Sequence, residues 1–323
     1  MKGHNYSIDI LKFICAILVV CLHTNSNLHN TIMPITRCAV PCFFMISGFL
    51  LYEENGINKS RLLRNIKHIF NITIWATLLF FVWTEILSIK SNSFFIPHTM
   101  QWLEFVFLNE NPFGFHLWYL GAYLYVLIIM YIVERKQYYH YLFVITPFLL
   151  LCDLIFGKYS LLLLNREIPY ICVRNFIFVG IPYFSIGMLM KRYYSKITNI
   201  NRFILMGGVI LFVLTSFLER NILISIGKNS IRDHYISTTF LSICLMMSLL
   251  TFKIKDRTLC SSIGEKNSLY IYILHPIFIT IMFSFVCTLP NRFVIIYEWI
   301  SPIIIFTVTL IFTIILRKIK IIK

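Results

Sequence analysis

Two side chains in the first apolar segment of the chain have the types and the spacing to do chemistry. Lys12 and His23 interrupt the segment IDILKFICAILVVCLHT and stand eleven residues apart. At about 100° per residue, this spacing puts both side chains on one helix face, roughly 16 Å apart along the axis. A lysine can hold an anionic group, and a histidine can take up a proton near neutral pH. Because titratable groups in a membrane span usually face a bundle interior, this helix is predicted to line a functional cavity.

A second set of polar side chains is predicted to gather at the depth of that histidine, in the outer half of the membrane. They lie at the ends of other apolar segments, and they are Arg37, Glu85, His116, Trp118 and Arg174. Cations and imidazoles of this kind can bind an anionic or polyhydroxylated group, or stabilise a developing oxyanion. The set therefore predicts a substrate-binding site.

Each of these residues also has a structural interpretation. Arg174 can extend its guanidinium to lipid headgroups, and Trp118 can belong to an ordinary aromatic belt. Lys12 can be an anchor at the cytoplasmic end of its helix. His275 precedes a proline and is expected toward the inner half of the membrane, near the level of Lys12, where it can bond a freed carbonyl. His23 is the hardest to explain structurally, because it lies well inside its span.

The composition of the chain predicts an integral membrane protein. Hydrophobic residues make up 58% of the 323 residues and charged residues 13%, against about 25% charged in a soluble domain. The net charge of +15 comes from short clusters between apolar segments, which indicates loops facing anionic lipid rather than a nucleic-acid partner. The nine cysteines lack paired CxxC spacing and the histidines lack zinc-ligand spacing, so neither disulfides nor a metal are expected. Asp9 and Lys12 interrupt the front of the chain, which argues against a cleavable signal peptide.

Ten apolar segments are long enough to cross a bilayer of about 30 Å. They are residues 8–26, 36–53, 68–88, 115–134, 139–156, 170–190, 203–219, 235–252, 268–289 and 296–316. Nineteen lysines and arginines lie in the loops on the N-terminal side and seven in the loops on the other side. The excess places both termini in the cytoplasm. The expected fold is an all-α polytopic bundle forming one domain over residues 1–323.

The first two segments carry a resemblance. IDILKFICAILVVCLHT followed by TRCAVPCFFMISGFLL resembles the N-terminal signature of the acyltransferase family 3 membrane proteins, and HLWYL at 116–120, RNFIFVGIPYFSIGMLM at 174–190 and SLYIYILHP at 268–276 extend the match. Such proteins typically have ten helices and transfer acetyl or other acyl groups to cell-surface glycans. The similar branches include enterobacterial-antigen O-acetyltransferase-like proteins, intercellular-adhesin acyl-modifying proteins and the membrane domain of vancomycin-resistance serine racemases, which has been regarded as a transporter. Lys12 stands where the family commonly has arginine, so the charge is kept without the bidentate fork.

The resemblance implies an O-acyltransferase of the bacterial inner membrane. Its donor would be an acyl-CoA, most simply acetyl-CoA, with phosphates near Lys12, and its acceptor a glycan or lipid-linked sugar. His23 would act as general base or carry the acyl group, while the predicted binding residues would position the acceptor: Arg37, His116, Trp118 and Arg174. The alternatives are a transporter or flippase for a small polar substrate or glycan precursor, and a scaffold in a polysaccharide-export complex.

Overall fold

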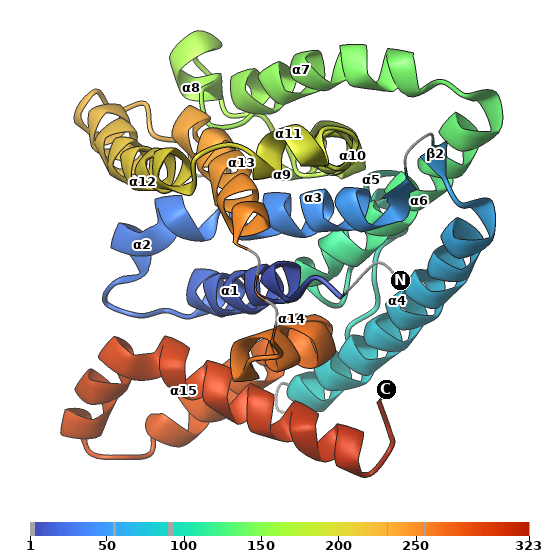
Figure 1. Cartoon of the computed structure of the whole chain (residues 1–323). Coiled ribbons are helices and arrows are strands. Elements are labelled where there is room, and N and C mark those ends of the chain that lie inside the picture. The colour runs from blue at the N-terminus through green and yellow to red at the C-terminus, as the bar shows by residue number, and fades with distance from the viewer. Residues whose placement is uncertain are drawn as a thin grey trace. The chain divides into compact units, whose positions relative to one another are not determined.

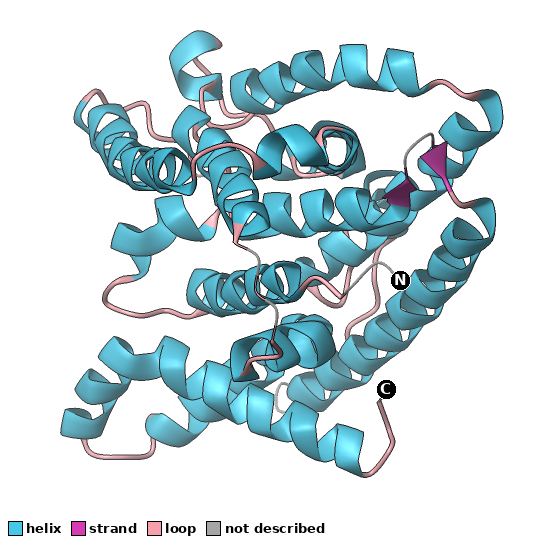
Figure 2. Ribbon diagram, in the orientation of Figure 1, coloured by secondary structure: helices cyan, strands magenta, loops and turns pink. Residues whose placement is uncertain are grey.

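The computed structural model of the chain describes residues 4–53, 56–89, 94–230, 232–252, 254 and 256–322. Figure 2 shows a helical fold, and the strands of the described residues are the antiparallel pair β1 (Tyr52–Glu53) and β2 (Gly56–Ile57). The helices are α1 (Tyr6–His23), α2 (His29–Thr36), α3 (Ala39–Leu51), α4 (Lys59–Ser88), α5 (Thr99–Leu108), α6 (Trp118–Lys136), α7 (Tyr139–Phe156), α8 (Ser160–Leu163), α9 (Tyr170–Val173), α10 (Ile181–Arg192), α11 (Tyr194–Thr198), α12 (Arg202–Ser225), α13 (Ile236–Thr251), α14 (Leu259–Val286) and α15 (Asn291–Lys318). A 3₁₀ turn, η2 (Phe115–Leu117), precedes α6, and a π-helical turn, η3 (Phe176–Gly180), precedes α10.

The all-α polytopic bundle is confirmed. Within the described residues, nine helical stretches are long and apolar enough to cross a membrane, and the shorter apolar helix α13 coincides with the predicted span 235–252. Some of the cations counted for sidedness lie outside the described residues: Lys2, Lys90, Lys253, Lys255 and Lys323. The chain is a multi-pass membrane protein.

Several helices begin well before the apolar runs that predicted them. α4 starts at Lys59 instead of residue 68, and α14 starts at Leu259 instead of residue 268. Both starts are capped: the side chain of Asn58 accepts from the Arg61 amide, and Thr258 with Ser261 forms a capping box. Such caps supply partners for the free amides of a first turn, so the helix continues through polar sequence that a hydropathy pattern does not register.

The chain folds into two compact units that interleave along the sequence. Unit 1 comprises Met1–Phe43, Ser195–Ile222 and Tyr235–Lys323, and unit 2 comprises Phe44–Tyr194 and Leu223–His234. Each unit is described by itself below.

In unit 1 the central pair is α1 and α14, with α15 next to α14 (Figure 1). A Cβ on Gly264 would lie 1.8 Å from the carbonyl oxygen of Asp9, so only glycine lets the two backbones approach this closely. Further along both helices, Ala16, Val20 and Ile271 share a buried cluster. Contacts therefore advance along α1 and α14 in the same direction, which makes the two helices parallel.

In unit 2, α10 packs against the C-terminal half of α3. A Cβ on Gly48 would lie 2.0 Å from the carbonyl oxygen of Phe184, and a Cβ on Gly187 would lie 2.0 Å from that of Met45. Small residues at both crossing points let the helices pack backbone to backbone, as is common in membrane bundles. α4 packs along α6 in the same unit.

Candidate active site

Two histidines from helices distant in sequence meet in unit 1. The imidazoles of His23, the last residue of α1, and His275, in α14, have ring centroids 5.1 Å apart with planes inclined by 41°. His23 is half-buried, and His275 is fully buried. Nδ1 of His275 lies 3.1 Å from the carbonyl oxygen of Ile271 and 2.8 Å from that of Tyr272. A ring nitrogen facing carbonyl oxygens must donate, so Nε2 of the neutral His275 ring is an acceptor.

The sequence prediction for His275 is wrong in its depth. The residue was expected near the level of Lys12, whereas its ring lies beside His23. The reason is the early start of α14 at Leu259, which makes His275 the seventeenth residue of a helix parallel to α1, while His23 is the eighteenth residue of α1. The capping box of α14 is the sequence signal that marks this start.

A cavity of about 210 Å³ is lined by residues that follow the two histidines along the chain. Thr24 follows His23 directly, and Ile279 lies one helical turn beyond His275. The lining residues are Thr24, Asn25, Ile279, Thr280, Phe283, Tyr297 and Ser301. None of them is a lysine, arginine, histidine, aspartate or glutamate, so the cavity offers hydroxyl, amide, aliphatic and aromatic groups.

Lys12 lies toward the other end of α1 and is already paired. Its Nζ is 2.9 Å from Oδ1 of Asp9, whose side chain is buried, and the lysine keeps 22% of its side chain exposed. The single charge of Lys12 is therefore partly balanced by a carboxylate of the same helix. Its predicted role in holding donor phosphates stays a prediction.

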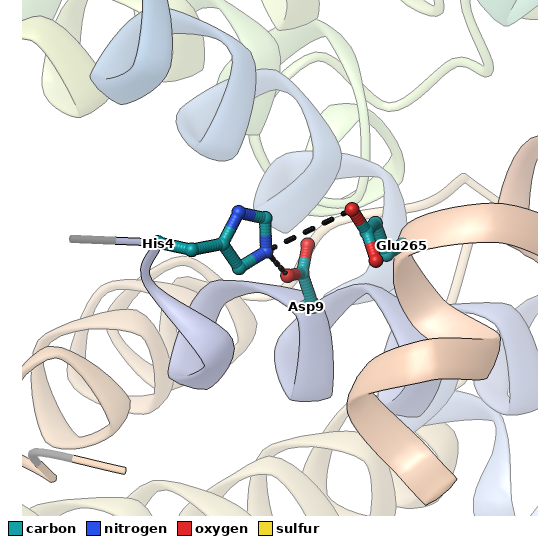
Figure 3. A group of neighbouring side chains, drawn as sticks. All are labelled: His4, Asp9 and Glu265. Carbon is teal, nitrogen blue, oxygen red and sulfur yellow. Dashed lines mark hydrogen bonds and ion pairs between the residues drawn. The ribbon is translucent and has the colours of Figure 1, made fainter. Parts of the chain in front are cut away.

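Around Asp9 the structure brings together three groups that often ligate metals. Nε2 of His4 lies 2.5 Å from Oδ2 of Asp9 and 3.9 Å from Oε1 of Glu265 (Figure 3). Lys12 also pairs with Asp9, and Nη2 of Arg257 lies 2.6 Å from Oε2 of Glu265. The two carboxylates thus meet two permanent cations, which leaves no excess negative charge for a divalent ion. The expectation that the protein uses no metal stays a prediction.

Arg37 lies at the break between two helices, α2 and α3, rather than at the start of a span. The sequence predicted a span starting at residue 36, but helix α2 begins at His29 and Arg37 caps its C-terminus before α3. Nη2 of Arg37 lies 3.7 Å from the sulfur of Met33, and the side chain is half-buried. Hydropathy missed α2 because its sequence HNTIMPIT is only weakly apolar.

In unit 2, Arg174 sits in an aromatic cage. Its guanidinium carbon lies 3.7 Å from the ring centroid of Phe115, 4.2 Å from that of Tyr170 and 5.0 Å from that of Trp118. Nη2 is 3.5 Å from Oε1 of Glu110, and Arg174 is only 5% exposed. Burial raises the pKa of the Glu110 carboxyl, and the Arg174 charge partly opposes that rise. Stacking on three rings holds a guanidinium firmly, so this arrangement can serve structure by itself.

His116 is enclosed in the same unit. It belongs to η2, is 5% exposed, and its ring centroid lies 4.6 Å from that of Phe80 on α4. Glu85, further along α4, has both carboxylate oxygens buried and makes no hydrogen bond through them within the described residues. The binding roles predicted for His116, Trp118 and Arg174 stay predictions.

Sequence reasoning missed a buried pair in unit 2, formed by a histidine and an aspartate. Nδ1 of His234 lies 2.8 Å from Oδ2 of Asp153, and both side chains are 3% exposed. Nearby, Tyr170 donates to Asp233, and Nε of Arg232 lies 2.8 Å from the carbonyl oxygen of Ile168. The cavity among these groups measures only about 10 Å³, enough for about one water. Asp153, alone in an apolar run, was the signal that a buried partner existed.

With the geometry established, comparisons with known proteins decide the family. The family model described as an acyltransferase domain, that of acyltransferase family 3, matches residues 5–318. The chain belongs to acyltransferase family 3. This membership agrees with the resemblance carried by its first two helical segments.

Two relatives of this acyltransferase family 3 protein are amino-acid racemases of Enterococcus faecalis. One is 30% identical over 166 residues and the other 29% identical over 134 residues. These alignments cover 49% and 38% of this chain but only 23% and 18% of the racemases. The chain thus matches less than a quarter of the length of either relative. No solved structure matches the chain.

The predicted site residues of this family member fall into two sets. Lys12, His23 and Arg37 belong to unit 1, where His23 meets a histidine that the sequence placed elsewhere. The other set belongs to unit 2 and consists of His116, Trp118 and Arg174. The contacts described above for each set are with residues of the same unit, such as His275 for His23 and Glu110 for Arg174.

Proposed function

We propose that this membrane acyltransferase moves an acyl group, with acetyl as the first candidate, from a cytoplasmic acyl-CoA to a hydroxyl of a cell-surface or lipid-linked glycan. The observation that carries the proposal is the contact of His23 with His275 beside a cavity lined by hydroxyl-bearing side chains. Acyl transfer to a hydroxyl needs a positioned base, and histidine is the side chain most often used. The expected location is the bacterial inner membrane.

The donor would approach from the cytoplasmic end of α1. Its phosphates would lie near Lys12, whose charge Asp9 balances in part, and near Arg257. The thioester arm would then run along α1 to His23, over roughly 16 Å of helical rise. An extended pantetheine arm is of comparable length, which makes His23 reachable from that end.

At His23 the reaction would proceed by base catalysis. The imidazole would take the proton of the acceptor hydroxyl while its oxygen attacks the thioester carbonyl, forming the new C–O bond. As the tetrahedral intermediate collapses, the C–S bond breaks and the CoA sulfur leaves with the proton from His23. The acceptor nitrogen of His275 is suited to orient the imidazole and to stabilise its protonated form. A transient acyl-histidine is the alternative route for the same residue.

The test compares membranes that contain the wild type, His23→Ala or His140→Ala, each supplied with labelled acetyl-CoA and total bacterial glycolipid. Label should enter the glycan fraction with the wild type and with His140→Ala, a matched control at an exposed histidine of unit 2. His23→Ala should lose at least about 100-fold, within the range of a lost general base. Wild-type activity that survives intact in His23→Ala would contradict the assigned role.

The rival function is transport of a small polar substrate without chemistry. What favours it is the similarity to two amino-acid racemases, enzymes that act on amino acids. Proteoliposomes loaded with the protein and offered labelled serine distinguish the two functions. Serine uptake, together with no label transfer from acetyl-CoA in any glycan fraction, would replace the acyltransferase proposal.

A further inference from the structure

The 210 Å³ cavity of unit 1 has walls of one chemical character. The α1–α2 connection contributes Thr24 and Asn25, α14 contributes Ile279, Thr280 and Phe283, and α15 contributes Tyr297 and Ser301. Aliphatic and aromatic surface makes up most of the lining, and hydroxyl and amide groups interrupt it. An apolar wall with a few convergent polar groups is the usual makeup of a small-molecule site.

Ser301 lines this cavity with a hydroxyl group that lacks a hydrogen-bond partner among the described residues. The residue is 1% exposed, and its Oγ makes no hydrogen bond within the described part of the chain. Other hydroxyls of α15 are satisfied by their own helix: Thr309 donates to the Ile305 carbonyl at 2.7 Å and Thr313 to the Leu310 carbonyl at 2.8 Å. Because buried hydroxyls in folded proteins are nearly always paired, the Ser301 hydroxyl is suited to a ligand.

The neighbouring threonines present oxygen lone pairs. Thr24 donates its hydroxyl proton to the Val20 carbonyl at 3.0 Å, and Thr280 donates to the Pro276 carbonyl at 3.1 Å. Each hydroxyl oxygen keeps lone pairs that can accept from a ligand. The wall thus offers acceptors at Thr24 and Thr280 beside the free hydroxyl of Ser301, a set that matches the hydroxyl groups of a polyol.

Charge and volume narrow the class of ligand. None of the lining side chains carries a permanent charge, so a phosphate or carboxylate would be desolvated there without a counter-charge. A cavity of about 210 Å³ has room for one six-membered sugar ring. The rings of Phe283 and Tyr297 supply the apolar surface on which the C–H face of such a ring can pack.

We propose that this cavity is the acceptor site and holds one neutral, polyhydroxylated sugar ring whose reacting hydroxyl faces His23. The inference rests on the proposed acyl transfer and names its acceptor class. It also places acceptor recognition on Thr24, Thr280 and Ser301 of unit 1, and assigns it to neutral hydrogen-bonding groups instead of cations.

The kinetic test uses full-length protein in membranes and varies acceptor and acetyl-CoA separately. Ser301→Leu should raise the acceptor KM at least tenfold, and Ser301→Ala several-fold, while the KM for acetyl-CoA stays within twofold of wild type. Ile303→Phe is the matched control, because Ile303 lies on the same helix with 69% of its surface exposed. An unchanged acceptor KM in Ser301→Leu overturns the proposal. So does a change of preference from acetyl-CoA to a longer acyl-CoA, since the cavity would then hold the acyl group.

A binding measurement separates failure of this inference from failure of acyl transfer. Ser301→Cys, in a background with the exposed Cys172 and Cys287 changed to serine, is labelled with a maleimide in the presence of methyl glucoside or of glucose 6-phosphate. Protection by the neutral sugar alone supports the site, even for a protein that transfers no acyl group. Equal protection by both sugars, or by neither, overturns it.

Discussion

The histidine pair of unit 1 and the ionic network of unit 2 are both polar and built from distant segments, yet they differ in the space nearby. Residues that follow His23 and His275 along the chain line a cavity of about 210 Å³, whereas the groups around Asp153 and Arg174 enclose about 10 Å³. In unit 2, Arg174 and Asp153 each have an opposite charge or imidazole within the unit. The two regions therefore differ in the room that they leave for a ligand.

The network of unit 2 lies where helices are interrupted. The Asn175 side chain accepts from the amides of Ile177 and Phe178 as η3 begins, and the Asn109 side chain accepts from the amide of Phe176. Broken helices at membrane depth need such partners, because lipid supplies none. This need accounts for Asn109 and Asn175.

The largest expected effect that separates the two regions is on stability, at Arg174. Arg174→Ala leaves the half-buried Glu110 carboxylate, 20% exposed, without its cation. Losing one partner of a fully buried pair costs about 3–5 kcal/mol, and the cost here is expected to lie below that range. Thermal unfolding in detergent should show a clear loss of Tm. The double variant Arg174→Met with Glu110→Gln should recover most of it, since no buried charge is then left alone.

The activity of Arg174→Ala tests whether Arg174 stabilises unit 2 or binds substrate. The folded fraction of Arg174→Ala should keep acyl transfer within about threefold of wild type, because the residue stabilises unit 2. A variant that retains its Tm but loses transfer would break the comparison and restore the substrate-binding role predicted for Arg174.

An intermediate effect is expected at His275. His275→Asn keeps a side-chain N–H but removes the ring nitrogen that can accept from His23. The value of kcat should fall about 10- to 100-fold, as for a weakened general base, with the acceptor KM nearly unchanged. The acid limb of the pH profile of kcat should move in the same variant. A fall in Tm with an unchanged pH profile would assign His275 to packing alone.

The smallest effect concerns pH and Glu110. Burial raises its pKa in the folded protein above the ordinary 4.5, with the Arg174 charge opposing part of the rise. The folded state therefore takes up a proton at a higher pH than the unfolded state, so stability increases as pH falls from above the raised pKa toward 4.5. The Tm of wild type minus that of Glu110→Gln should become more positive between pH 7 and pH 5. A difference that stays constant over this range would argue that Glu110 does not titrate there.

Local sequence predicted the spans and singled out His23 as a candidate site residue, because apolar runs and isolated titratable residues are local features. It misjudged His275, since the first nine residues of α14, LCSSIGEKN, are helical although most of them are polar or small and give no apolar run. The contact of His234 with Asp153 joins residues 81 positions apart. Nothing local specifies that pairing, although a lone aspartate in an apolar run shows that some partner is required.

The close approach at Gly264 has a further consequence for how this chain can change. α1 and α14 pack closely at Gly264 near one end, and the imidazoles of His23 and His275 meet near the other. The number of residues between these two points in each helix therefore sets the register of the two histidines. One residue added to either helix between these points would turn its histidine by about 100° and shift it by about 1.5 Å. Insertions in α1 and α14 should therefore be tolerated only in matched pairs, although about 235 residues, 24–258, separate the two helices in sequence.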